Sequence, residues 1–287
     1  MTISFNPKRR GLWNARPEVV NFLKENKVLD NVLNLPKKEM LNHSSFIDTF
    51  KSYILNSKFT KVKGLDTFNE VVPCLGLTEI LNEFYYQHKN IKVLKGEYPY
   101  TRTRTKCEFV EDSPLQKGDA FLVSIPFSAS GTIHPKTYQL FKICEDLDIP
   151  VLVDCAWFGT CGDMNIDLRS SAIKQVGFST SKAYSKFYRA GIRFSRDLKN
   201  DSDSLFIHDR TQWLHYFNLK INEQLLKNHS ADFLFEKYRD KQLKICKELN
   251  IIPSNCIHIG LGGEEYKHCN RDNTYNRVNI IELLEPR

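Results

Sequence analysis

A strand, a helix and a second strand follow one another between residues 120 and 157, and this order constrains the fold more than any other stretch. The segments "AFLVSIPF" (120–127) and "PVLVDCAW" (150–157) are predicted to be buried strands. Between them, "PKTYQLFKICEDLD" (135–148) begins with proline and carries apolar residues at helical spacing. Two apolar strands joined by a helix are typical of a parallel sheet that is covered by helices.

Neighbouring segments extend the same pattern. "AIKQVGFSTS" (172–181) and "GIRFSR" (191–196) are predicted to add two short strands, and the residues from about 203 to 249 are predicted to be mostly helical. Near the end, "NCIHIGLGG" and "YNRVNIIELL" are predicted to be strands. We therefore expect an α/β protein: a three-layer α/β/α sandwich with a mostly parallel sheet, and a reduced small α+β lobe.

The expected organisation has three parts within 287 residues, a length that can bury a large core. We expect an N-terminal segment over residues 1–60, a large domain over 61–200 and a small lobe over 201–287.

Composition narrows the partners. Lys and Arg number 41 against 34 Asp and Glu, and the excess lies partly in short clusters such as "NPKRR" and "YTRTRTK", so we do not expect nucleic acid as a partner. The eight cysteines include no CxxC pair, and no apolar stretch approaches the roughly 18 residues of a membrane span. We expect reduced thiols in a cytoplasmic protein with no membrane partner.

Lys182 closes the segment "VGFSTSK", where a buried ammonium would be costly. By residue type alone, a solvated surface lysine is the commoner case. Four motifs, however, fall at predicted strand ends or helix starts: "CLGLTEI", "IPFSASGTIHP", "VDCAWFG" and "STSKAYSKFYRAGIR". In open α/β sheets, ligands bind at the carboxyl ends of the strands, so these motifs are expected to meet.

The order and spacing of the four motifs, from about Val71 to Arg196, resemble those of the fold-type I pyridoxal-phosphate enzymes, especially the class I/II aminotransferases in a shortened form. The resemblance implies pyridoxal 5′-phosphate (PLP) as cofactor and an amino acid and a keto acid as substrates. It also implies a homodimer with the active site at the subunit interface. The expected activity is that of an aminotransferase.

The resemblance also assigns residues to the cofactor ring. Lys182 matches the lysine that forms the Schiff base, and Asp154 in "DCAW" matches the carboxylate that keeps the pyridine nitrogen protonated. Trp157 stands where the family has a tyrosine that donates to the phenolic oxygen, and Ser128 in "IPFSASGT" stands where it has an asparagine. Tyr98 in "GEYPY" is expected over the ring, with Tyr100 as second choice, although such aromatic residues are more often core.

Phosphate binding requires a helix start together with hydroxyl and cationic donors. The residues implied are Gly76, Leu77, Thr78, Ser179 and Arg193. Arg189 is the alternative to Arg193, and a plain helix cap is the alternative for Thr78. Arg277 in "YNRVNI" matches the arginine that binds the substrate α-carboxylate, with a solvated strand arginine as the alternative.

Other chemistries are weaker matches. Cys256, His258, His268 and Cys269 have no usual zinc spacing, so we expect no metal. Two alternatives to an aminotransferase stay open: a PLP enzyme of another reaction type, such as a lyase or decarboxylase, and a degenerate relative without catalytic activity.

Overall fold

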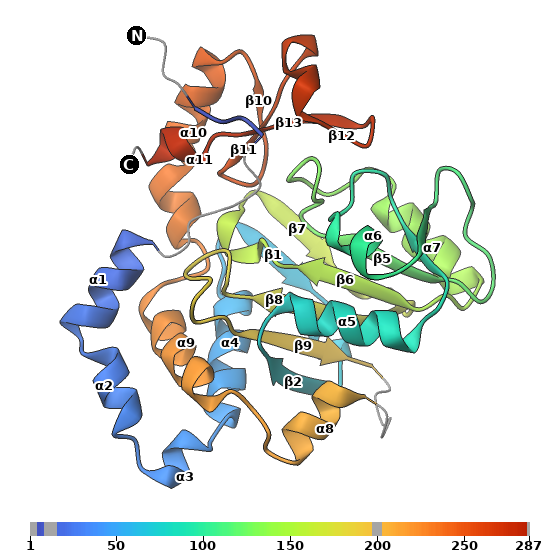
Figure 1. Ribbon diagram of the computed structural model, residues 1–287. Helices are drawn as coiled ribbons and strands as arrows, with labels where there is room; N and C mark the ends of the chain where they lie inside the picture. Colours follow the sequence, from blue (N-terminus) through green and yellow to red (C-terminus); the bar gives the residue numbers. More distant parts are fainter. Residues whose placement is uncertain (1–4, 9–15, 197–202, 286–287) are drawn as a thin grey trace.

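A seven-stranded sheet forms the centre of the molecule in the computed structural model, which describes residues 5–8, 16–196 and 203–285 (Figure 1). From one edge to the other the strands are β2 (Glu70–Cys74), β9 (Gly191–Ser195), β8 (Ile173–Ser179), β6 (Val151–Cys155), β5 (Ala120–Ser124), β3 (Ile91–Val93) and β4 (Cys107–Phe109). β9 runs antiparallel to both neighbours, and the other pairings are parallel. The expectation of a mostly parallel sheet is confirmed.

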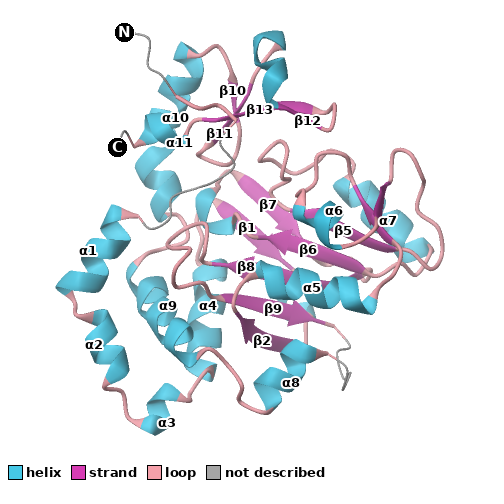
Figure 2. Cartoon of the chain, in the orientation of Figure 1, coloured by secondary structure: helices cyan, strands magenta, loops and turns pink. Residues whose placement is uncertain are grey.

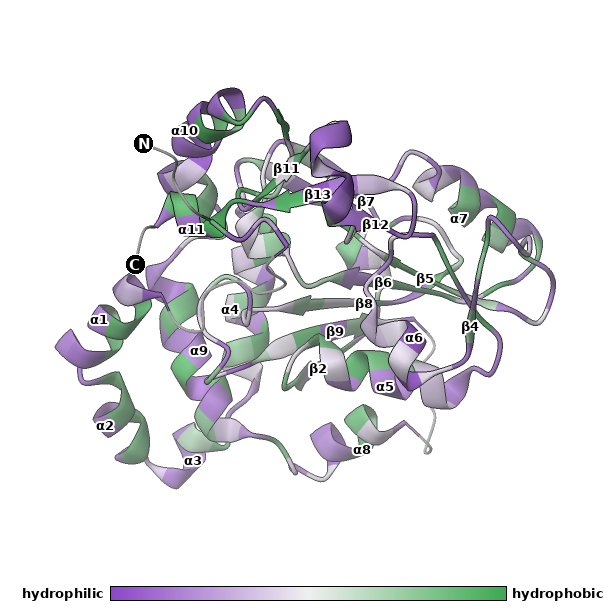
Figure 3. Ribbon diagram, turned by 45° about the horizontal axis from the view of Figure 1, so that its top comes forward, coloured by the Kyte–Doolittle hydropathy of each residue, from purple (hydrophilic) through white to green (hydrophobic). Residues whose placement is uncertain are grey.

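The central strands are apolar throughout because both faces of the sheet are buried. On β5, Phe121 and Val123 pack into one core cluster, whereas Ala120 and Leu122 pack into another. This alternation is that of a strand whose successive side chains point to opposite faces. Figure 3 shows the hydrophobic residues concentrated along β5 and β6. A continuous apolar run was therefore the correct signal for these strands.

Helices cover both faces and complete the three expected layers (Figure 2). One layer holds α5 (Leu77–Gln87), α6 (Tyr100–Arg104) and α8 (Ser204–Arg210). The other holds α4 (Ser44–Leu55) and α7 (Thr137–Asp146), with α9 (Tyr216–Asn228) packed against α4. α5 lies close to β8 at Gly177, where a Cβ atom would come within 2.6 Å of both Leu77 and Ile80.

The remaining elements flank this sandwich. Near the start of the chain lie α1 (Pro17–Glu25), α2 (Val28–Leu33), α3 (Lys37–Met40), β1 (Thr60–Lys63) and the 3₁₀ turn η1 (Leu65–Thr67). After β6 come a second 3₁₀ turn, η2 (Phe158–Thr160), and β7 (Met164–Asp167). β1 pairs in parallel with β7 and ties the N-terminal segment to the middle of the chain.

A separate four-stranded sheet forms the small lobe. Its order is β10 (Ile252–Pro253), β11 (Ile259–Leu261), β13 (Tyr275–Asn279) and β12 (Asn270–Arg271). The same region contains α10 (Phe233–Glu248), η3 (Glu264–Cys269) and α11 (Ile281–Leu284). α8 and α9, which we assigned to the lobe, contact β2, α5 and α4 of the large sandwich. The domain boundaries stay a prediction.

In the part of the chain that the structure describes, no helix combines the length and the apolar character needed to cross a lipid bilayer.

Candidate active site

A cavity of about 540 Å³ opens beside the carboxyl ends of β5, β6 and β8 and is closed on one side by the small lobe. It brings together most of the residues expected from sequence. Its wall includes Gly76, Leu77, Thr78, Tyr98, Ser128, Asp154, Trp157, Lys182 and Arg277. Ser179 and Arg193 are not in the wall.

Lys182 enters the cavity from the turn that follows β8. No hydrogen bond or ion pair joins its amine to another described residue. Burial lowers the pKa of Lys182, and the nearby cation of Lys186 lowers it further, whereas Asp154 acts in the opposite direction. A lysine in such surroundings is easily deprotonated, which is the state in which an amine acts as a nucleophile.

Asp154 lies on β6, directly beside β8, where it pairs with Gly177. Its side chain is 5% exposed, and one carboxylate oxygen accepts a hydrogen bond from the Ala156 N–H at 2.8 Å. Burial raises the pKa of Asp154 to about 6, although the Ala156 N–H and the charge of Lys182 oppose this. The carboxylate is therefore under-compensated and would be stabilised by a cation in the cavity.

A glycine opens the start of α5 toward the cavity. Gly76 has φ +102°, and a Cβ atom there would lie 2.9 Å from Ser179 Oγ. Only glycine fits this backbone and this space without strain. No side chain caps the first turn of α5, whose Leu77 and Thr78 line the cavity, so its N–H groups can approach an anion.

Ser179 supports this cradle from behind. Its hydroxyl lies 2.9 Å from the hydroxyl of Ser181 and donates to the Ala190 carbonyl at 3.2 Å. Ser181, in contrast, lines the cavity. The structure therefore exposes Ser181 to a ligand and places Ser179 beneath it.

Arg193 is a correction to the sequence analysis. It lies within β9, is 1% exposed, and donates through both terminal nitrogens to Asp203 at 2.8 Å each. Asp203 in turn caps α8 by accepting from the Phe206 N–H. This pair lies on the face of the sheet that α8 covers, away from the cavity, so Arg193 is not a ligand of it. Arg189, which precedes β9, lines the cavity instead.

Two tyrosines form the aromatic part of the wall near α6. The rings of Tyr98 and Tyr100 are stacked, with centroids 5.9 Å apart, and both line the cavity. Tyr98 remains 42% exposed, so it is not the core aromatic that the alternative interpretation required.

The small lobe contributes an arginine to the same cavity. Arg277 on β13 is buried and donates from Nη1 to the Ser128 carbonyl at 3.0 Å. Its guanidinium lies over the ring of Trp157, 4.9 Å from the ring centroid, which is a cation–π contact. The alternative of a solvated strand arginine is therefore wrong.

Several groups at the cavity were not assigned from sequence. Lys186, Ser181, His258, Arg271 and Asn279 line it, and the buried Glu97 lies behind Ser124, whose N–H donates to it at 2.7 Å. Burial raises the pKa of Glu97 to about 7. Lys186 and Ser181 belong to the motif around Lys182, whereas no local pattern marked Arg271 or Asn279.

The comparisons with known proteins separate sequence from fold. No protein-family model matches the chain, and no curated protein sequence matches it. Solved structures do. Tyrosine aminotransferase from Leishmania infantum is similar with a TM-score of 0.67 and 12% identity, over 97% of this chain and 90% of that one. An N-succinyldiaminopimelate aminotransferase from Thermus thermophilus, so named as a probable assignment, gives 0.66 and 13%, over 98% and 91%.

The chain has the aminotransferase fold. A third similar structure with this fold, from Clostridium difficile 630, is assigned as an aminotransferase and was solved with PLP bound. It aligns with a TM-score of 0.62 and 13% identity over 95% of this chain and 87% of that one.

The residues present fit PLP. The cradle at Gly76 has room for a phosphate only because a side chain is absent there. Asp154 is a buried carboxylate that lacks a full counter-charge, and Lys182 is an amine whose pKa is lowered. These are an anion site, a partner for a ring N–H and a nucleophile within one cavity of the aminotransferase fold.

Proposed function

We propose that the protein is a PLP-dependent aminotransferase that acts on an amino acid and a keto acid, with Lys182 as the Schiff-base lysine. The observation that carries the proposal is the pairing of Lys182 with Asp154 at adjacent strand ends in one cavity. Their charges interact, and burial favours the neutral form of each. When bound, PLP supplies an electron sink for the pair of electrons left on the substrate Cα after proton loss.

Lys182 would have two tasks. Its neutral amine would hold the cofactor, and after substrate displaces it, the same amine would take the proton from Cα and return it elsewhere. Burial and the cation of Lys186 favour the neutral form that both tasks need. Asp154 would accept the ring N–H and keep that nitrogen protonated, which would satisfy its under-compensated charge.

The remaining wall residues would orient the cofactor. The N–H groups at the start of α5, the hydroxyls of Thr78 and Ser181, and Arg189 would bind the phosphate. Tyr98 would cover the ring, while Ser128 and Trp157 would stand near its phenolic oxygen. A serine hydroxyl and an indole N–H are each able to donate one hydrogen bond there.

Arg277 would bind the α-carboxylate of the amino or keto acid. A guanidinium matches a carboxylate with two parallel hydrogen bonds. Contacts with Trp157 and with the Ser128 carbonyl fix the orientation of this arginine before substrate arrives. The substrate is thereby held between the small lobe and Lys182.

A spectrum of the purified protein tests the proposal. Adding PLP should give visible absorbance that survives gel filtration, and Lys182→Ala should abolish it. Lys174→Ala is the matched control because Lys174 lies on the same strand, β8, and is not in the cavity wall. Wild-type protein that stays colourless with added PLP would contradict the proposal and favour the degenerate relative.

The reaction type needs a second measurement. Loaded enzyme mixed with an amino acid and no acceptor should release one equivalent of keto acid and then stop. Release of carbon dioxide, or continuous release of ammonia, would favour the decarboxylase or lyase alternative instead.

We further propose a cytoplasmic homodimer whose interface borders the cavity. Phe187 is 68% exposed and follows Lys186 in the cavity wall, which supports a covering partner at this position. The described cysteines are all free thiols. Sedimentation should show a dimer that Phe187→Asp weakens, and an active wild-type monomer would contradict this part.

A further inference from the structure

His258 is a buried imidazole in the cavity wall that the proposed reaction does not use. The side chain is 1% exposed, and neither Nδ1 nor Nε2 has a hydrogen-bond partner among the described residues. Leaving a buried polar group unpaired costs about 1–3 kcal/mol, so native proteins rarely keep one without a reason.

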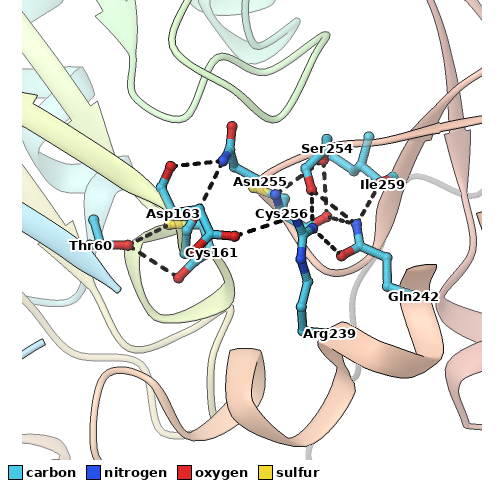
Figure 4. A network of polar contacts seen from close by, with 10 residues as sticks. Thr60, Cys161, Asp163, Arg239, Gln242, Ser254, Asn255, Cys256 and Ile259 are labelled. Atoms are coloured by element: carbon cyan, nitrogen blue, oxygen red, sulfur yellow. Dashed lines mark hydrogen bonds and ion pairs between the residues drawn. The ribbon is translucent and has the colours of Figure 1, made fainter. Parts of the chain in front are cut away.

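The backbone that carries His258 is held firmly. It belongs to a turn in which the Ile259 N–H donates to the Cys256 carbonyl at 3.0 Å, and the Ile257 N–H donates to the Thr160 carbonyl at 3.1 Å. Gln242 Nε2 on α10 donates to the carbonyls of Ser254, Cys256 and Ile259 at 3.2, 2.9 and 3.0 Å. Figure 4 shows Gln242 and Arg239 meeting this backbone. The turn is therefore a prepared element, not a loose loop.

The position of His258 relates it to the substrate. Its ring meets Trp157 edge to face, with centroids 5.0 Å apart, and the guanidinium of Arg277 lies 4.9 Å from the same indole centroid. A group bonded to His258 would thus lie within one amino-acid side chain of a carboxylate bound to Arg277. Burial and the charges of Arg277 and Lys182 keep the pKa of His258 well below its usual range. The neutral ring offers one donor and one acceptor.

A metal does not explain this imidazole. Across residues 5–8, 16–196 and 203–285, no group of three or more His, Cys, Asp or Glu side chains could hold a metal ion. The unused hydrogen-bonding capacity therefore points into the cavity.

We propose that His258 recognises a hydrogen-bonding group on the side chain of the substrate, so that the preferred amino acid is polar beyond its α-carboxylate. This inference rests on the proposed aminotransferase function. An apolar side chain in the same place would leave both ring nitrogens unpaired and desolvated. Sites that are built to bond a polar group discriminate strongly against analogues that lack it.

Matched substrate pairs test the inference. The half-reaction is measured with amino acids that differ in one polar group: serine and alanine, glutamine and norleucine, tyrosine and phenylalanine. For at least one pair, kcat/KM of wild-type protein should favour the polar member about 10- to 100-fold, the factor expected from one buried hydrogen bond. His258→Phe should remove that preference by slowing the polar member, and His258→Gln should restore part of it.

The readouts separate this inference from the function on which it rests. The visible absorbance of PLP reports loading of each variant independently of turnover, and His258→Phe should keep it. If the loaded His258→Phe protein slows both members of every pair equally, or wild type prefers no polar member, the recognition role is wrong while the function stands. If wild type binds no PLP, both are wrong.

Discussion

Two buried lysines of the same sheet have opposite surroundings. Lys92 on β3 is 2% exposed and is surrounded by acceptors: it bonds Glu108, donates to Ser113 Oγ at 2.6 Å and lies 3.9 Å from the buried Asp119. Lys182 makes no such bond with a described residue, and its pKa is lowered by burial and by three neighbouring cations. Burial alone therefore does not mark a functional lysine, whereas the sign of the neighbouring charges does.

Two arginines repeat the contrast. Arg193 is closed into a bidentate pair with Asp203, and Arg189 faces the cavity. Charges away from the cavity are matched within the chain. In the cavity, positive groups outnumber the single acid Asp154, as is suitable for a site that receives anionic ligands.

The largest expected effect comes from removing each lysine in cofactor-free protein. Lys92→Met leaves Asp119 buried beside a neutral side chain, and breaking a buried pair in this way costs about 3–5 kcal/mol of unfolding free energy. Lys182→Met removes a cation that burial disfavours, so stability should stay within about 1 kcal/mol of wild type or rise. Chemical denaturation measures both. Equal losses would remove the distinction between the two lysines.

Asp154→Asn tests the acid that accompanies Lys182. The folded-state pKa is about 6 against an ordinary 3.8, so folding favours the protonated form, and the stability from this group falls as pH rises from about 4 to 6. The variant lacks that loss. It should be more stable than wild type above pH 6 by up to about 3 kcal/mol in cofactor-free protein.

The same variant should bind PLP but turn over much more slowly, because an amide does not keep the ring nitrogen protonated. Denaturation at pH 4 and pH 7.5 and a half-reaction assay measure the two effects. Glu97→Gln is the control, since Glu97 is also a buried acid with a raised pKa but lies outside the cavity wall. Unchanged turnover in Asp154→Asn would overturn the assignment.

Arg277→Lys sharpens the comparison on the substrate side. Replacing a guanidinium fork with a point charge loses a bidentate contact, which costs about 2–3 kcal/mol and lowers kcat/KM roughly 30- to 150-fold. PLP absorbance should not change, because the phosphate donors lie elsewhere in the wall. Normal turnover of every amino acid tested would place the carboxylate site at another residue.

The smallest effect is expected from the arginine that faces the phosphate. Arg189→Ala should weaken PLP binding about tenfold without a matching loss of stability, because it removes one charge-assisted contact. Arg193→Met should show the reverse, since it strands Asp203 but does not touch the cavity. Titration with PLP and thermal denaturation separate the two. PLP affinity that depends on Arg193 and not on Arg189 would reverse our correction.

Local patterns predicted what local forces determine. The β5, α7 and β6 unit follows from apolar runs and helical periodicity, and Asp154 and Lys182 follow because parallel strand ends meet at one edge. Arg193 was misplaced because motif spacing does not say which face of β9 a side chain takes. His258 was missed because its turn is positioned by Gln242 and Thr160, which are distant in sequence.

The contact between Gly76 and Gly191 has a consequence for how the protein folds. Cys74 at the end of β2 pairs with Gly191 at the start of β9, more than a hundred residues later, and a Cβ atom on Gly191 would lie 2.7 Å from Gly76 Cα. Such non-local pairing forms late, because a long loop must close first. The anion cradle therefore exists only in chains that have completed the sheet. A ligand bound there raises the free energy of global unfolding and selects fully folded molecules.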